Sequence, residues 1–230
     1  MQALFSQHFG NALWARRSVC SVGFEANPHH TDRLSELQRR YRALGWRFTA
    51  FLETAASTSD GTASFQFDVS RAGSKHNEYG ASLLQSRYNQ GANRGIMGRA
   101  RSAHTTVRTV NLARWLREEV GNRKMPAELP PGAAVGSSPQ LLMKLDIEGS
   151  EYSVLPRLYE SRTICLFNAV FIEFHAVSAA VLATVGAVNA ETFVQRLESN
   201  LSTTPGCERT RIIHLDDETY EHDGVSWPAA

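Results

Sequence analysis

Four side chains capable of acid–base or metal-binding chemistry follow two apolar runs of the sequence. Asp146 and Glu148 come directly after the first run, and Glu173 and His175 close the second. The members of each pair are two residues apart, so in an extended strand both side chains point the same way. Neighbouring parallel strands end at one edge of a sheet. We therefore predict that all four side chains converge at one polar edge.

Such an edge has three interpretations. In the first, it grips a cofactor and an acceptor, with Glu148 or His175 removing a proton from an attacking hydroxyl. In the second, it binds a divalent metal, because carboxylates and an imidazole suit a hard or borderline cation. In the third, the acids only stabilise a helix N-terminus, by ~0.3–1 kcal/mol each. We favour the first, with Glu148, His175 and Asp146 as the catalytic set and no residue assigned to a metal.

The elements that must position these residues are strands and helices in alternation. Residues 141–145 predict a buried strand, after which Gly149 and Ser150 open a helix. Pro156 lies inside that helix and predicts a kink or a short first turn. Residues 169–174 predict the next strand. Further along, Asn189 is expected to cap a helix to residue 198, and the last strand is expected at 211–215.

The N-terminal part predicts a strand–helix–strand unit. Residues 18–24 form a short apolar run typical of a buried strand, and 46–52 form a second. Between them, Thr31 is expected to cap a helix that stops at Gly45. This order predicts two parallel strands. Glu25 follows the first strand, where nucleotide-binding sheets place an acid for ribose hydroxyls; a solvated turn glutamate is an equal alternative.

The middle of the chain is less regular. Asp60 and Gly61 predict a turn before a strand at 63–69. The sequence then predicts an arginine-rich insert at about 70–105 and, after a strand ending near 110 and a helix capped by Asn111, an irregular linker at about 121–139. A first helix is expected at 3–15. We expect one domain over residues 1–230.

Composition limits the possible partners. Hydrophobic residues make up 42% and charged residues 20%, with a net charge of +1, so the whole molecule has no strong attraction to nucleic acid or membrane. The charge is unevenly spread: residues 71–124 hold eleven Lys and Arg against three Asp and Glu, whereas 146–223 hold five against thirteen. The basic part suits an anionic acceptor such as a phosphorylated or acidic sugar or a lipid head group, or it is a solvated loop. Interleaved aromatics are lacking, so we expect no nucleic acid.

The three cysteines are spread far apart. Their odd number and wide spacing argue against a disulfide scaffold and a structural zinc site. Cys20 and Cys165 lie in apolar runs and are expected to be buried thiols. No signal peptide is recognised, and no apolar run approaches the ~20 residues of a membrane span. A reducing, cytoplasmic location is the expectation.

Several blocks, taken in order, carry a family resemblance. The run KLDIEGSEYSVLPRL resembles the K-x-D-x-E-G-x-E-x-x-x-L signature of the FkbM-type methyltransferase family. Four further blocks resemble other parts of that family: GFEANP, AASTSDGTASF, TVRTVNLARWL and VFIEFH. Together they cover roughly residues 19–220.

The resemblance implies an α/β fold with a Rossmann-like class I methyltransferase sheet of seven mostly parallel strands and helices on both faces. S-adenosylmethionine would lie across the carboxyl edges of the strands. Glu25 would accept the ribose hydroxyls, and Asn27 of the same turn belongs to the cofactor-binding set. Ala55 and Ala56 would line the adenine pocket. Asp146 would face the methionine amino group or the acceptor, with Glu148 at the reaction edge.

The sequence departs from the family at its start. No D-x-G-x-N-x-G-like motif occurs in residues 1–18, so the first strand and its glycine-rich turn are missing, and we expect an N-terminally truncated domain. The resulting hypothesis is an S-adenosylmethionine-dependent methyltransferase acting on an oxygen of a small molecule or sugar. The alternatives are a non-catalytic remnant that acts as a binding module and, less favoured, a metal-dependent glycosyltransferase. The sequence leaves the oligomeric state open.

Overall fold

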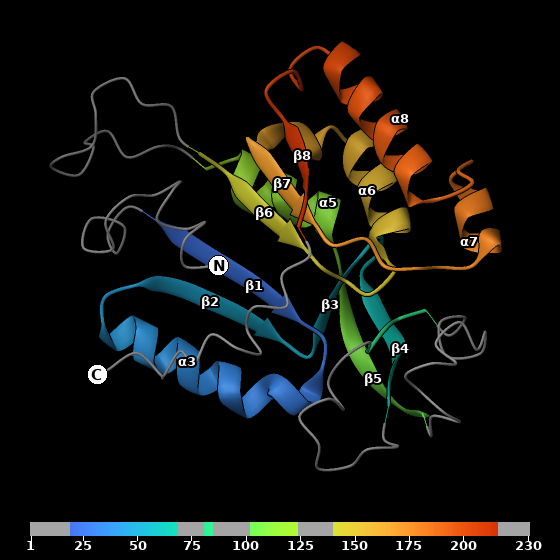
Figure 1. Cartoon of the computed structure of the whole chain (residues 1–230). Coiled ribbons are helices and arrows are strands. Elements are labelled where there is room, and N and C mark those ends of the chain that lie inside the picture. Colours follow the sequence, from blue (N-terminus) through green and yellow to red (C-terminus); the bar gives the residue numbers. More distant parts are fainter. Residues whose placement is uncertain (1–18, 69–80, 85–101, 124–139, 216–230) are drawn as a thin grey trace, which may run out of the picture. The chain divides into compact units, whose positions relative to one another are not determined.

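The computed structural model describes residues 19–68, 81–84, 102–123 and 140–215 (Figure 1). They fall into two compact units, one formed by the described residues up to Glu53 and the other by the rest. The helix predicted at 3–15, most of the arginine-rich insert and nearly all of the linker lie outside the described residues. Whether the chain is one domain stays a prediction.

The first unit is the predicted strand–helix–strand. It consists of β1 (Cys20–Glu25), the 3-10 turn η1 (Pro28–His30), α3 (Thr31–Ala43) and β2 (Arg47–Leu52). The two strands are parallel and in register over their whole length, as the sequence predicts. The prediction that β1 is buried is wrong, because its first three residues are exposed and its last three half-buried. Among the described strands it pairs with β2 alone.

The ends of α3 show one wrong and one confirmed prediction. Thr31 does not cap the helix; instead Asn27 caps the preceding 3-10 turn, its Oδ1 accepting from the amide of His29 at 3.0 Å. Gly45 does end the helix, with φ of 83°. The amides of Gly45 and Trp46 donate back into the last turn at 2.9 Å each, which satisfies carbonyls that the helix leaves open.

The second unit contains two three-stranded sheets. One has the order β3-β5-β4 and the other β6-β7-β8. Their bounds are β3 (Thr54–Ser57), β4 (Gly61–Asp68), β5 (Ser102–Asn111), β6 (Leu142–Leu145), β7 (Ala169–Ile172) and β8 (Arg211–His214). All pairs except β4–β5 are parallel. The α/β class with mostly parallel strands is thus observed. The described strands form three separate sheets, however, and not the single seven-stranded sheet that the resemblance implies.

The helices of the second unit follow its strands in the sequence. They are α5 (Leu112–Trp115), which continues as the π-helical turn η3 (Leu116–Gly121), then α6 (Glu151–Glu160), η4 (Thr163–Leu166), α7 (Ala179–Thr184) and α8 (Ala190–Thr203). The predicted caps Asn111 and Asn189 are confirmed by side-chain bonds to helix amides. α6 runs through Pro156. None of the described helices has the length and hydropathy of a bilayer-spanning segment.

The core of this unit lies between β7, α6 and α8. All four residues of β7 are buried. Leu155 and Leu158 on the inner side of α6 are wholly inaccessible to solvent. The rings of Tyr152 on α6 and Phe193 on α8 lie 5.3 Å apart, which joins the two helices. This packed core fixes the ends of β6 and β7, where the predicted polar residues begin.

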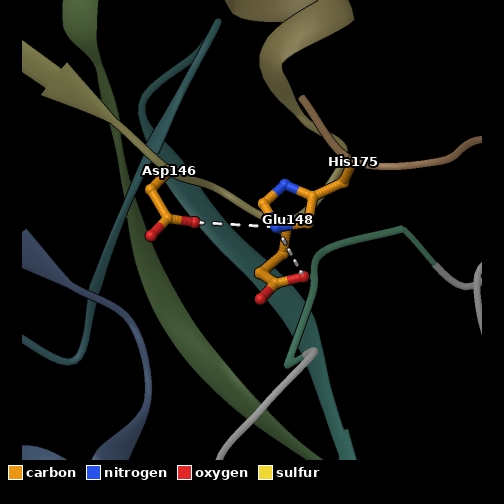
Figure 2. A group of neighbouring side chains, drawn as sticks. All are labelled: Asp146, Glu148 and His175. Atoms are coloured by element: carbon orange, nitrogen blue, oxygen red, sulfur yellow. Dashed lines mark ion pairs between the residues drawn. The ribbon is translucent and has the colours of Figure 1, made fainter. Parts of the chain in front are cut away.

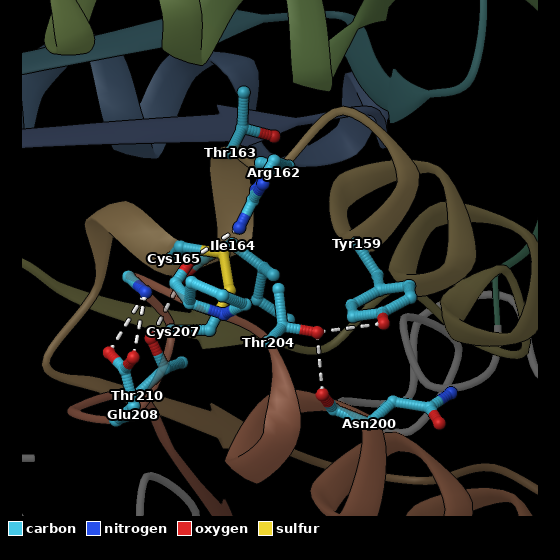
Figure 3. The surroundings of a disulfide bond; sticks show 12 residues. Tyr159, Arg162, Thr163, Ile164, Cys165, Asn200, Thr204, Cys207, Glu208 and Thr210 are labelled. Atoms are coloured by element: carbon cyan, nitrogen blue, oxygen red, sulfur yellow. Dashed lines mark hydrogen bonds between the residues drawn. A yellow bond between two sulfur atoms is a disulfide. The ribbon is translucent and has the colours of Figure 1, made fainter.

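A disulfide corrects two expectations about the cysteines (Figure 3). Cys165 in η4 is bonded to Cys207 before β8, so it is not a thiol. Cys20 is a free cysteine and exposed. The same two segments are also joined by the hydroxyl of Thr210, which donates to the carbonyl of Phe167 at 2.9 Å. Disulfides persist mainly in oxidising environments, so this bond does not favour the cytoplasmic location, which stays a prediction.

The acid of the Asp60–Gly61 turn ties β3 and β4 to the start of α5. Asp60 Oδ1 accepts from the amide of Asn111 at 3.1 Å and from Nη2 of Arg114 at 2.7 Å. The amide bond first, and the guanidinium second, lower the pKa of Asp60 below its usual value. The acid of the alanine-then-acid-glycine block therefore connects the turn between β3 and β4 to the start of α5.

We predict that Asp60→Asn lowers the free energy of unfolding at pH 7. An acid with a lowered pKa in the folded state stabilises the fold above its unfolded pKa, near 3.8, and loses that contribution as the pH falls further. The difference between the wild type and Asp60→Asn should therefore shrink below about pH 4. Urea unfolding between pH 3 and 7 measures it. A difference that stays constant with pH would contradict the role assigned to Asp60.

Thiol titration of the unfolded chain tests the disulfide. We expect one reactive thiol, that of Cys20, before reduction and three after it. Cys20→Ser should leave none before reduction. Finding three thiols in the freshly purified, unreduced protein would show that Cys165 and Cys207 are not bonded.

Candidate functional site

The backbone bends sharply where the chain leaves β6 and enters α6. Glu148 and Gly149 both have positive φ, 56° and 98°. For a residue with a side chain this conformation costs roughly 1–2 kcal/mol, and it persists only when the surroundings fix it. Here the hydroxyl of Ser82 donates to the carbonyl of Glu148 at 2.7 Å. Ser82 is itself paired with Gln66 of β4 by two bonds of 2.9 Å, so the other sheet holds this bend.

Glu151 joins the bend to the segment after β7. Its side chain is completely buried, at the first position of α6. Oε1 accepts from the amide of Ile147 at 3.1 Å and lies 3.0 Å from Nδ1 of His175. Its other oxygen, Oε2, has no hydrogen-bond partner among the described residues. The carboxylate therefore fixes both the bend and the plane of the imidazole.

Tyr152 holds the same segment by its backbone. Its hydroxyl donates to the carbonyl of His175 at 3.2 Å. Burial, and to a smaller extent the Glu151 carboxylate, raise the pKa of Tyr152 above its usual value, so it remains a neutral donor. His175 is thus held at its ring by one residue of α6 and at its main chain by the next.

The four residues selected from the sequence lie together; we call Asp146, Glu148, Glu173 and His175 the carboxylate–imidazole cluster. Nε2 of His175 is 3.7 Å from Asp146 Oδ1, 3.5 Å from Glu148 Oε2 and 3.4 Å from Glu173 Oε1. Figure 2 shows the ring directed toward the first two carboxylates. The His175 side chain is only 10% exposed. The structure therefore confirms the predicted convergence at the ends of two adjacent parallel strands.

Charge at the cluster is strongly negative. Four carboxylates, those of the cluster and Glu151, surround a single imidazole. Lys144 brings a positive charge to this edge, because its Nζ lies 3.2 Å from Asp146 Oδ2. This contact occupies one oxygen of Asp146 and leaves the other facing His175. Such crowding of like charge is unfavourable unless a positive group compensates it.

The contact with Glu151 also decides what His175 can do. If Nδ1 carries the proton and donates it to the carboxylate, Nε2 keeps its lone pair. An imidazole in this state can accept a proton from a hydroxyl or bind a cation. Either use requires that a hydroxyl or a cation lie between Nε2 and the carboxylates. The distances from Nε2 to the carboxylate oxygens are longer than the 2.7–2.9 Å typical of charge-assisted hydrogen bonds.

Two residues expected to bind the cofactor lie in the first unit. Glu25 accepts from the amide of Asn27 at 2.7 Å through Oε1, and its Oε2 lies 3.2 Å from Nδ1 of His30. Asn27 is almost completely buried. Its Nδ2 has no hydrogen-bond partner among the described residues. A buried donor without a partner is costly, so this amide is suited to an acceptor atom of a ligand.

The other two, Ala55 and Ala56, lie in β3 of the second unit and are buried. Sequence reasoning did not select Glu151, Lys144 or Ser82. Glu151 and Lys144 belong to the signature block, and that position is the feature of the sequence that could have indicated a role for them. Ser82 lies in the irregular arginine-rich part of the sequence, where no pattern indicates its contact with Glu148.

Gly149 provides a test of how closely the bend is packed. A Cβ there would lie 3.0 Å from Leu84 Cδ1 and from Val177 Cγ1, whereas at Gly206, with φ of 85°, it would meet nothing within 4 Å. Gly206→Ala should cost roughly 1–2 kcal/mol of backbone strain alone. Gly149→Ala should cost that plus roughly 1–3 kcal/mol of overpacking.

Urea unfolding of Gly149→Ala and Gly206→Ala measures the cost of backbone strain and the added cost of overpacking. Because both positions have a positive φ, the difference between the variants isolates the contacts with Leu84 and Val177. Equal losses of unfolding free energy would show that the bend is not closely packed.

Comparison with protein families links this site to a known group. The sequence model of the FkbM methyltransferase domain matches residues 5–190. Comparisons with curated proteins and with solved structures found no match. The family match includes β6, β7 and the whole carboxylate–imidazole cluster, and it spans well over half of the chain. The chain therefore belongs to the FkbM methyltransferase domain family.

Proposed function

We propose that this protein is an S-adenosylmethionine-dependent methyltransferase that methylates an oxygen of a small molecule or sugar. Family membership supports a methyltransferase. The observation that carries the chemistry is the carboxylate–imidazole cluster at the ends of β6 and β7, with its imidazole held by Glu151. This edge combines groups that can orient an acceptor with groups that can take a proton.

S-adenosylmethionine, when bound, would supply a methyl group on a positively charged sulfur: the acceptor oxygen would bond to the methyl carbon in line as the carbon–sulfur bond breaks and the neutral thioether leaves. The hydroxyl must lose its proton as it attacks. His175, through Nε2, and Glu148 are the two candidates to receive it, because an imidazole nitrogen and a carboxylate oxygen lie 3.5 Å apart there and either can accept a proton. Asp146, with one oxygen engaged by Lys144, orients the acceptor or the amino group of the cofactor.

Further residues are proposed to contact the cofactor. Asn27 fits this role through its buried Nδ2, which lacks a partner among the described residues. Glu25 fits as an acceptor for ribose hydroxyls, although the turn already engages both of its oxygens. Ala55 and Ala56 are proposed to line the adenine site. The excess of Lys and Arg in residues 71–124 supports an anionic acceptor.

Calorimetric titration of the full chain with S-adenosylmethionine tests the cofactor. We expect saturable binding that Glu25→Ala weakens by about 10- to 150-fold, since a hydrogen bond involving a charged group contributes about 1.5–3 kcal/mol. Glu36→Ala is the control, because Glu36 lies on α3 of the same unit and pairs only with Arg39 and Arg40 among the described residues.

Absence of cofactor binding, or equal affinities for Glu25→Ala and Glu36→Ala, would contradict the proposal. With binding established, transfer of labelled methyl groups to a panel of hydroxylated small molecules and sugars identifies the acceptor. Asp146→Asn should then reduce transfer more than it reduces cofactor affinity, if Asp146 orients the acceptor.

A further inference from the structure

We propose that Asp146, Glu148 and His175 form a binding site for a divalent cation, with Mn²⁺ as the best-suited probe. Each offers one ligand atom, and these atoms all lie within 4.8 Å of one another. The site itself follows from geometry and charge. Only its consequence for catalysis rests on the proposed function.

The separations fit a shared cation. Nε2 of His175 lies 3.7 Å from Asp146 Oδ1 and 3.5 Å from Glu148 Oε2. A cation about 2.2 Å from each atom would make ligand–cation–ligand angles of about 115° and 105° at these separations. Both angles are close to those of tetrahedral coordination. Direct ion pairs would bring the same atoms to about 2.8 Å.

His175 supplies a second, independent observation. Its side chain is nine-tenths buried, and Nδ1 is fixed by the carboxylate of Glu151. Nε2 therefore faces the carboxylates, and it forms no hydrogen bond of ordinary length with any residue that the structure describes. A histidine that binds a metal through one nitrogen commonly gives the other N–H to a carboxylate, which fixes its tautomer and orientation. Glu151 occupies that position.

Charge favours the same conclusion. Four carboxylates gather around the imidazole, and the ammonium of Lys144 lies beside one of them, that of Asp146. A divalent cation would offset part of this concentrated negative charge. Two carboxylate oxygens and one imidazole nitrogen are a mixed set: carboxylates suit Mn²⁺, and imidazole suits Zn²⁺ and other first-row cations. Three protein ligands would leave coordination positions for water or for oxygens of an acceptor.

Within the proposed function, the cation would make a bound acceptor hydroxyl lose its proton more readily, so that water could take up the proton in place of a side-chain base. The lone pair of Nε2 would then be used for coordination. Nε2 of His175 can therefore either bind the cation or accept a proton, but it cannot do both at once. The acceptor would then be a molecule that presents an oxygen able to coordinate a metal.

Electron paramagnetic resonance tests the site on the full chain after treatment with a chelator, in the absence of S-adenosylmethionine. We expect Mn²⁺ to bind at one saturable site and to show coupling to a ligand nitrogen. Glu148→Gln should weaken binding by more than the roughly 10- to 100-fold that loss of an outer partner costs. Asp146→Asn is the second ligand variant, in case the first does not fold.

Two matched controls separate coordination from general negative charge. Glu160→Gln removes an exposed acid of α6 that pairs with Arg157, and it should leave the affinity unchanged. Glu173→Gln removes an acid equally near Nε2 but outside the three-ligand set, so its effect should be smaller than that of Glu148→Gln. Equal effects of Glu148→Gln and Glu173→Gln, absence of nitrogen coupling, or no saturable binding would overturn the proposal.

The outcome is distinguishable from that of the proposed function. Titration of the same samples with S-adenosylmethionine gives the second measurement. Cofactor binding without Mn²⁺ binding would overturn the cation site and leave the methyltransferase proposal in place. Mn²⁺ binding without cofactor binding would support the site and count against methyl transfer.

Discussion

The buried carboxylate of Glu151 is the constraint on which the geometry of the polar edge depends. It binds the amide of Ile147 in the bend after β6 and the imidazole of His175 after β7. A carboxylate without solvent is expensive unless hydrogen bonds compensate it. Its position at the start of α6 adds the favourable helix dipole. The contacts that keep this carboxylate buried therefore also bring the ends of two strands together.

The bend itself shows how the second unit maintains an unfavourable backbone. Glu148 has a side chain at positive φ, which costs roughly 1–2 kcal/mol. One hydrogen bond to its carbonyl, from Ser82, contributes about 0.5–1.5 kcal/mol, and the close packing around Gly149 adds to it. Strain of this kind is concentrated at functional sites. Here it directs the Glu148 side chain toward His175, a direction that a regular strand-to-helix connection would not give.

The excess negative charge links the two proposals. Whether the compensating group is a metal ion, a proton on the imidazole or the cationic part of a cofactor, the carboxylates favour positive charge at one place. Lys144 reduces this excess and also orients Asp146. The disulfide between η4 and the segment before β8 lies elsewhere in the same unit, where it links covalently two segments that pack beside β7.

Much of this arrangement follows from local sequence. Apolar runs and turn residues determine the positions of β1, β2, β4, β6, β7 and β8, and the caps at Asn111 and Asn189, because these depend on neighbouring residues. The positions of Asp146 and Glu148 after β6, and of Glu173 and His175 after β7, place the four residues at one edge once the two strands pair in parallel, whereas the direction of the Glu148 side chain depends on the positive φ of that residue. Contacts between segments that are far apart in the sequence could not be predicted from local patterns. The hydroxyl of Ser82 on the bend, the pairing of Cys165 with Cys207, the exposure of β1 and the division of the strands into three sheets all depend on which segments pack together. The roles of Glu151 and Lys144 could not be predicted either. Both residues belong to the signature block, but only the folded chain shows that Glu151 contacts His175 and that Lys144 contacts Asp146.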